Sequence, residues 1–165
     1  MPPGGASLGD ERNEGRLAIP YISAANDVVS IRFRSLDDSG PKYLSRVGEA
    51  SHLFGVSCLL NDARSAVLVE GEIDQMILSQ MSVVAAGCPG VKAWRKPWRW
   101  LFADFDQVIV LADGDEAGRE FGKRMVEELG SLVSTTMVEC PAGEDTNSLY
   151  VKHGPEAVRQ LLRGL

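Results

Sequence analysis

Five carboxylates follow segments that read as buried strands, and their spacing could assemble a cation site. Glu70 ends one apolar run and Asp74 lies one helical turn later, Asp113 and Asp115 follow another run, and Asp145 follows a further one. Carboxylates in one small site repel each other by ~4 kcal/mol per pair at 4 Å and an effective dielectric of 20, and a bound divalent cation relieves that repulsion. Because these ligands are all hard oxygens without a nearby His or Cys, the pattern predicts Mg²⁺ or Mn²⁺ rather than zinc. Mg²⁺ held in this way is typical of phosphoryl chemistry.

A second interpretation of the same residues is a helix N-cap, because carboxylates favour the positive end of the helix dipole. For Asp113 and Asp115 alone, a cap explains the residues as well as a metal does. Because acidic residues follow three separate strands in the sequence, a metal site is favoured over simple helix caps.

The elements that must position these residues are strands that alternate with helices from Ser65 onward. Continuous apolar runs predict buried strands, and an apolar stripe formed by Phe121, Met125 and Leu129 predicts an amphipathic helix that ends near Gly130. The expected strands cover 66–70, 82–86, 107–113 and 132–140, and the expected helices cover 72–81, 94–105, 116–130 and the C-terminus. This alternation predicts an α/β fold with a mainly parallel sheet flanked by helices. Ligands of such sheets bind beyond the carboxyl ends of the strands, where the carboxylates lie.

The segment before residue 65 has a different pattern, with short strands and turns. Short strands are expected over 16–21 and 27–36, followed by a turn at 37–40, which together predict a small antiparallel β subdomain. We therefore divide the chain into a Pro/Gly-rich flexible tail (1–15), a small basic β subdomain (16–64) and an α/β domain with C-terminal helices (65–165).

Composition excludes several classes of protein. The net charge of −6 argues against a protein that holds nucleic acid by bulk positive charge. The three cysteines contain no C-x-x-C pair, which argues against a zinc ribbon or a disulfide framework and favours a reducing cytoplasm. No run approaches the ~18 apolar residues of a membrane span, so no membrane partner is expected.

The segments 68–74 (LVEGEID) and 108–120 (VIVLADGDEAGRE) resemble the Toprim domain of DnaG-type bacterial and phage primases. The flanking segments 31–45 (IRFRSLDDSGPKYLS) and 140–154 (CPAGEDTNSLYVKHG) are also similar to primase segments. The resemblance implies a four-stranded, mainly parallel Toprim-like sheet. It further implies a template-directed polymerase that makes short RNA primers from NTPs on single-stranded DNA during replication.

Carried over by position, the resemblance implies a role for each acidic residue. Glu70 matches the family's catalytic glutamate, which acts as an acid/base or metal-linked group. Asp113 and Asp115 match the paired aspartates that hold Mg²⁺, and Asp74 and Asp145 match further acidic positions of the same site.

Three basic residues, Arg32, Arg34 and Lys42, lie in the segment that resembles the basic motif ahead of Toprim, and there they are expected to contact template and nucleotide phosphates. Strand alternation places Arg32 and Arg34 on one face. The alternative is an ordinary solvated strand face.

A second basic patch contains Lys92 and Arg95, which we expect to be further phosphate contacts, interleaved with tryptophans. Trp94, Trp98 and Leu101 lie at helical spacing, and we interpret them as a core stripe rather than as base-stacking residues.

The sequence also departs from the primase pattern. Ser45 and Asn147 occupy positions where that pattern often has Asn and Asp, and these 165 residues contain neither a zinc-binding motif nor a P-loop. We therefore expect a separate zinc-binding domain protein and a replicative helicase as partners. The small size favours a phage or mobile-element protein, or one part of a split primase, that acts in the cytoplasm (of the host, if phage-encoded). A metal-dependent Toprim nuclease and a non-catalytic replication module are the alternative functions.

Overall fold

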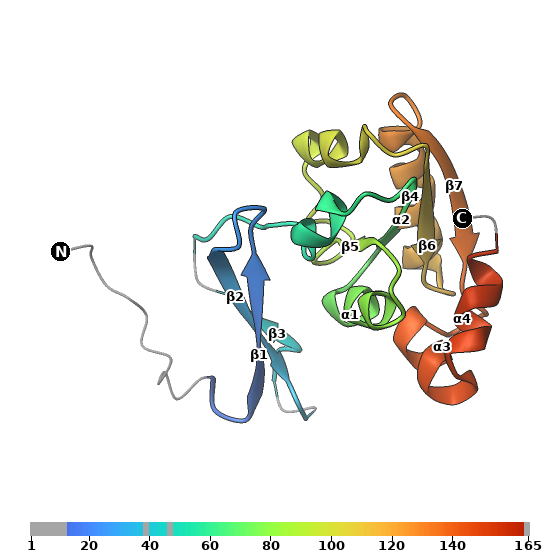
Figure 1. Cartoon of the computed structure of the whole chain (residues 1–165). Helices are drawn as coiled ribbons and strands as arrows, with labels where there is room; N and C mark the ends of the chain where they lie inside the picture. The colour runs from blue at the N-terminus through green and yellow to red at the C-terminus, as the bar shows by residue number, and fades with distance from the viewer. Residues whose placement is uncertain (1–12, 38–39, 46–47, 164–165) are drawn as a thin grey trace.

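The computed structural model describes residues 13–37, 40–45 and 48–163, which form two sheets (Figure 1). A three-stranded antiparallel sheet comprises β1 (Arg16–Ile22), β2 (Val28–Ser35) and β3 (Tyr43–Leu44), in the order β1-β2-β3. A four-stranded parallel sheet comprises β4 (Ser65–Val69), β5 (Ala85–Gly87), β6 (Gln107–Ala112) and β7 (Ser134–Glu139), in the order β5-β4-β6-β7. The α/β fold with a parallel four-stranded sheet and a small antiparallel sheet is thereby confirmed.

Four α-helices of the described ranges flank the parallel sheet. They are α1 (Glu72–Gln80), α2 (Glu116–Leu129), α3 (Thr146–His153) and α4 (Pro155–Leu161). The side chains of β4 and β6 alternate between two cores, because strands covered on both faces bury every side chain. Leu68 and Val110 pack with α2 residues in one core, whereas Val69 and Leu111 pack with residues of α1, α3 and α4 in the other. The sheet is therefore the middle of three layers.

Helix α2 packs with the stripe that the sequence predicts. Phe121, Met125 and Leu129 are all buried, and Gly130 forms the C-cap.

Helix α1 is buried on two sides, because it lies between the two sheets (Figure 1). Leu78 packs into the core of the parallel sheet. Ile73 and Met76 pack instead against Ile19 and Tyr21 of β1. The first turn of α1 therefore faces the antiparallel sheet directly.

One expected helix has a different geometry. The segment Lys96–Phe102 is a 3-10 helix, which begins with a proline at its first turn. Trp94 and Trp98 pack against the core as predicted, but Leu101 is 39% exposed and Phe102 is buried in its place. Trp94 lies ahead of this helix, so Trp94, Trp98 and Leu101 do not form one face of a single helix.

The other boundaries differ by a few residues at strand ends. Strand β5 begins at Ala85, three residues later than expected, and β7 is confined to Ser134–Glu139. The expected tail at 1–15 lies outside the described residues up to position 12, and the proposed domain boundaries stay predictions. No helix among the described residues is long and apolar enough to cross a membrane.

Candidate metal and nucleotide site

Glu70 and Asp113 lie at the carboxyl ends of two neighbouring parallel strands. Glu70 follows β4 and Asp113 follows β6, and these strands pair directly in the sheet. A carboxylate oxygen of Glu70 accepts the backbone N–H of Asp113 at 3.0 Å. The fold therefore brings together two residues that are 43 positions apart in sequence.

Asp115 has the cap role that its sequence position allows. It is the N-cap of α2, and its Oδ1 accepts the backbone N–H of Gly118 at 2.7 Å. Burial raises the pKa of Glu70, and the nearby negative charge of Asp115 raises it further. The cap uses one oxygen, so the second carboxylate oxygen stays available to a ligand.

Asp74 and Asp145 are joined to this edge through helix α3. Asp74 is in the first turn of α1, and its Oδ1 accepts the backbone N–H of Asn147 in α3 at 3.0 Å. Asp145 caps α3 in a capping box, with Ser148 N–H at 2.6 Å from its Oδ1. The loop behind β7 is thus held against α1.

Burial and like charges raise the pKa values of three carboxylates at this edge. Burial, with the charges of Glu70, Asp74, Asp145 and Asp115, raises the pKa of Asp113 to about 8. Burial and the charge of Asp145 raise the pKa of Asp74 to about 6. Burial also raises the pKa of Glu70. Such shifts are typical of functional sites, because they cost stability without a bound partner.

The donor set fits a hard divalent cation. None of the five carboxylates takes part in an ion pair of the described residues, although the charge of Arg34 offsets a small part of the burial-driven rise in the pKa of Asp74. Within the described ranges, no three His, Cys, Asp or Glu side chains are already gathered to hold one ion. Mg²⁺ commonly uses one or two carboxylates and keeps several waters, so it does not require a closed protein cage.

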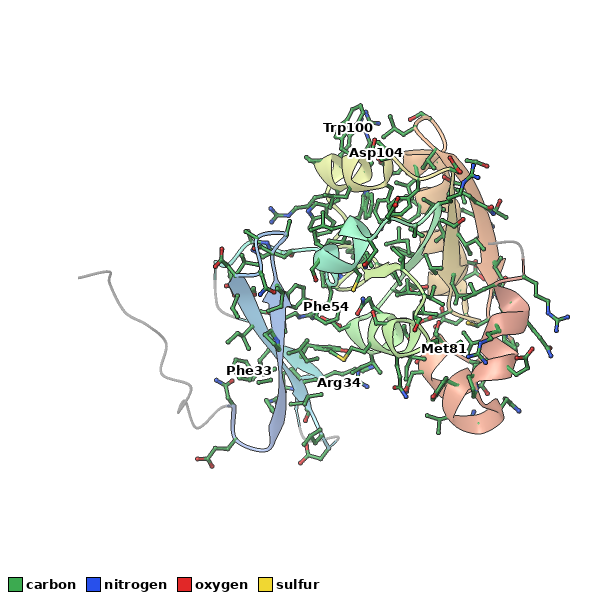
Figure 2. All side chains as sticks on the ribbon, in the orientation of Figure 1. Phe33, Arg34, Phe54, Met81, Trp100 and Asp104 are labelled. Carbon is green, nitrogen blue, oxygen red and sulfur yellow. The ribbon has the colours of Figure 1, made fainter. Side chains whose placement is uncertain are left out.

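The basic residues of β2 face this acidic edge from the antiparallel sheet. Arg32 and Arg34 share one strand face, because both guanidinium groups lie over the Tyr43 ring, at 4.3 and 5.4 Å from its centroid. Arg34 also donates to the Tyr43 hydroxyl at 2.6 Å. Figure 2 shows Arg34 leaving β2 on the side opposite to its neighbour Phe33. Lys42 is exposed beside Tyr43.

Lys92 lies in the loop that follows β5, and Arg95 lies at the end of that loop. Both are exposed. This loop is adjacent to the site, because Gly90 N–H donates to the Glu70 carbonyl at 3.3 Å. The described geometry therefore places Lys92 two residues from a direct contact with the Glu70 backbone.

Three residues that no sequence pattern singled out together connect the two sheets. Arg32, expected to be free for phosphates, forms an ion pair with Glu72, and Tyr21 donates to the same carboxylate at 2.5 Å. Glu72 looks in the sequence like an ordinary acidic residue in the first turn of a helix. The one available signal was Tyr21, a residue with a polar hydroxyl on a predicted strand, which needs a hydrogen-bond partner when it is buried.

Comparison with known proteins identifies the family of this chain. Residues 67–150 match the model of a family described as Toprim-like. The Gene 57 protein of Mycobacterium phage D29 is 36% identical over 148 residues, covering 87% of this chain and 95% of the phage protein.

Longer relatives contain a region that is similar to this chain. The DNA primase of Pasteurella multocida is 28% identical over 166 residues, which covers 93% of this chain but 28% of that primase. The solved Aquifex aeolicus primase, with its zinc-binding and RNA polymerase domains, superposes with a TM-score of 0.78 at 26% identity, covering 96% of this chain and 43% of that one. The chain therefore spans about a quarter to a half of these primases.

Proposed function

Because the chain belongs to the Toprim-like family, we propose that it forms the catalytic centre of a DNA primase, a nucleotidyltransferase that makes short RNA primers from NTPs on single-stranded DNA. The observation that carries the proposal is the convergence of Glu70, Asp113 and Asp115 at the carboxyl edge of the parallel sheet. The primase names of longer relatives support the substrate class, and the phage relative of similar length supports a phage setting.

The proposed reaction joins the 3′-hydroxyl of the growing primer to the α-phosphate of an NTP. The new O–P bond forms as the bond to pyrophosphate breaks, and the hydroxyl proton goes to a base or to solvent. Mg²⁺ bound at this edge would lower the pKa of the attacking hydroxyl and neutralise charge on the leaving group. The protein contributes mainly positioning and electrostatics.

Individual residues of this chain have distinct proposed roles. Asp113 and Asp115 hold the cation, and Asp74 and Asp145 add negative charge that increases its affinity. Glu70 lies beside Asp113 and is the candidate acid/base or metal-linked group. Arg34, Lys42, Lys92 and Arg95 are the proposed contacts to phosphates of the template and the NTP.

A primer-extension assay tests the proposal directly. An RNA primer annealed to a DNA template bypasses the initiation step, for which a separate zinc-binding protein and a helicase are the proposed partners. We expect labelled NTP to be added in an order set by the template and only with Mg²⁺ or Mn²⁺, and we expect Glu70→Gln to lose this addition while its circular dichroism spectrum stays unchanged.

The alternative functions give different results in the same reactions. Metal-dependent cleavage of the DNA or the RNA without NTPs would show a Toprim nuclease. Absence of both extension and cleavage would show a non-catalytic replication module.

A further inference from the structure

A buried polar network joins the antiparallel sheet to the first turn of α1. The Tyr21 hydroxyl and the Arg32 guanidinium both donate to the same carboxylate oxygen of Glu72. Arg32 also donates to the Pro89 carbonyl at 3.3 Å, behind β5. The network therefore links β1 and β2 with α1 and with the loop that follows β5.

The burial of this network sets it apart from the surface ion pairs. The Glu72 side chain is 2% exposed and the Arg32 side chain 18% exposed, whereas the Arg64–Asp106 pair is 89% and 58% exposed. Removing one partner of a buried pair leaves an uncompensated charge and is strongly destabilising. Burial also raises the pKa of Tyr21 above its usual range, so that its hydroxyl stays a neutral donor.

The position of Glu72 connects the network to the acidic edge. Glu72 lies between Glu70 and Asp74 in the sequence, and one turn of α1 carries both Glu72 and Asp74. On the opposite side, Arg32 is two residues from Arg34 on the same face of β2.

We propose that Tyr21, Arg32 and Glu72 form a positioning unit, which fixes the antiparallel sheet against α1 and so sets where Arg34 lies relative to Asp74. Arg32 then acts through Glu72 rather than by binding a phosphate. The nucleic-acid part of this inference rests on the proposed function, whereas the docking of the two sheets does not.

Thermal unfolding tests the docking without any substrate. Arg32→Met and Glu72→Met should each lower the melting temperature by about 6 to 20 °C, because each leaves one buried charge unpaired. The melting temperature of the double variant should fall by clearly less than the sum of the two single losses. Losses that simply add would overturn the positioning unit. Tyr21→Phe removes only one hydroxyl and replaces the single variants if they do not fold.

Binding to a fluorescent oligo(dT) strand, well below the melting temperatures, separates positioning from direct phosphate contact. A lost phosphate contact changes the slope of log K against log salt by about 0.7 on a single strand. The positioning unit predicts that Glu72→Met weakens binding and that the double variant regains the wild-type slope.

The opposite results identify Arg32 as a phosphate contact. In that case Glu72→Met frees Arg32 and binds at least as tightly as the wild type, and the double variant keeps the reduced slope. Arg34→Met is the matched control, because Arg34 lies on the same face but has no described ion pair; it should reduce the slope in either case. If the wild type binds no DNA, the proposed function fails while the unfolding result still decides the docking.

Discussion

The carboxylate of Glu70 accepts the backbone N–H of Asp113 across two parallel strands, at 3.0 Å. This hydrogen bond fixes the Glu70 side chain on the strand end from which Asp113 and Asp115 emerge. Asp74, Asp115 and Asp145 each accept another backbone N–H, and none of them forms an ion pair within the part of the chain that the structure describes. The fold therefore concentrates negative charge at one edge of the parallel sheet.

The pH dependence of stability should reveal this charge in the metal-free protein. The folded state raises the pKa of Asp113 to about 8 and that of Asp74 to about 6, from near 4 in the unfolded chain. The folded state thus binds more protons between pH 4 and 8, and stability from these groups falls as pH rises through that window. Urea unfolding with EDTA should show this decrease.

Asp113→Asn provides the control for that measurement. The variant cannot ionise at position 113, so the decrease between pH 6 and 8 should largely disappear. A decrease of wild-type size in Asp113→Asn would assign the effect to other groups.

Magnesium should stabilise the folded chain. A ligand at 100 times its dissociation constant adds about 2.7 kcal/mol, which corresponds to roughly 5 to 11 °C in melting temperature for a chain of this size. Differential scanning fluorimetry with MgCl₂ and matched NaCl tests this shift. Asp113→Asn should lose most of this rise in melting temperature. An unchanged rise in that variant would show that the ion binds elsewhere.

Gly114 is required by the close approach of the loop that carries Asp145. A Cβ at Gly114 would lie 2.0 Å from the Pro141 carbonyl oxygen, and the Gly114 N–H donates to the Glu144 carbonyl at 2.8 Å. Gly114→Ala must displace this loop and should cost about 1 to 3 kcal/mol of stability, as overpacking does.

Gly143 in the same loop is the matched control for Gly114. It has φ of 77° and open space at its Cβ, and asparagine tolerates that left-handed conformation. Gly143→Asn should cost about 1 kcal/mol or less of unfolding free energy, clearly less than Gly114→Ala. Equal costs for the two variants would contradict the role of the close contact.

Lys92 and Arg95 should contribute to DNA binding through phosphates. Replacing either by Met should change the salt slope of oligo(dT) binding by about 0.7 and weaken binding similarly for every sequence. Lys123, which is exposed on α2, is the control and should leave the slope unchanged. Identical slopes for Lys92→Met and wild type would remove Lys92 from the interface.

The sequence contains most of the information about the parallel sheet. Strands β4 and β6 are continuous apolar runs, and the stripe of Phe121, Met125 and Leu129 defines α2. Because parallel strands end at one edge, the strand assignments alone bring Glu70 near Asp113. That part of the site follows from local patterns.

The contacts between the sheets could not be predicted from those patterns. Glu72 and Tyr21 are 51 positions apart, and neither sits in a motif that indicates the other. The 3-10 helix at Lys96–Phe102 was also not apparent, since Trp94, Trp98 and Leu101 lie at α-helical spacing. Such features depend on tertiary packing, which a single sequence does not display.

Primer extension by Asp113→Asn, compared with Asp106→Asn, tests the central claim most directly. Both residues flank β6, but Asp113 lies at its carboxyl end, whereas Asp106 lies at the opposite end in an exposed ion pair. With Mg²⁺, we expect Asp113→Asn to lose roughly a hundredfold or more in nucleotide addition, the scale of a lost electrostatic contact in a transition state, and Asp106→Asn to match the wild type. Equal addition by all three proteins would contradict a catalytic cation at this edge.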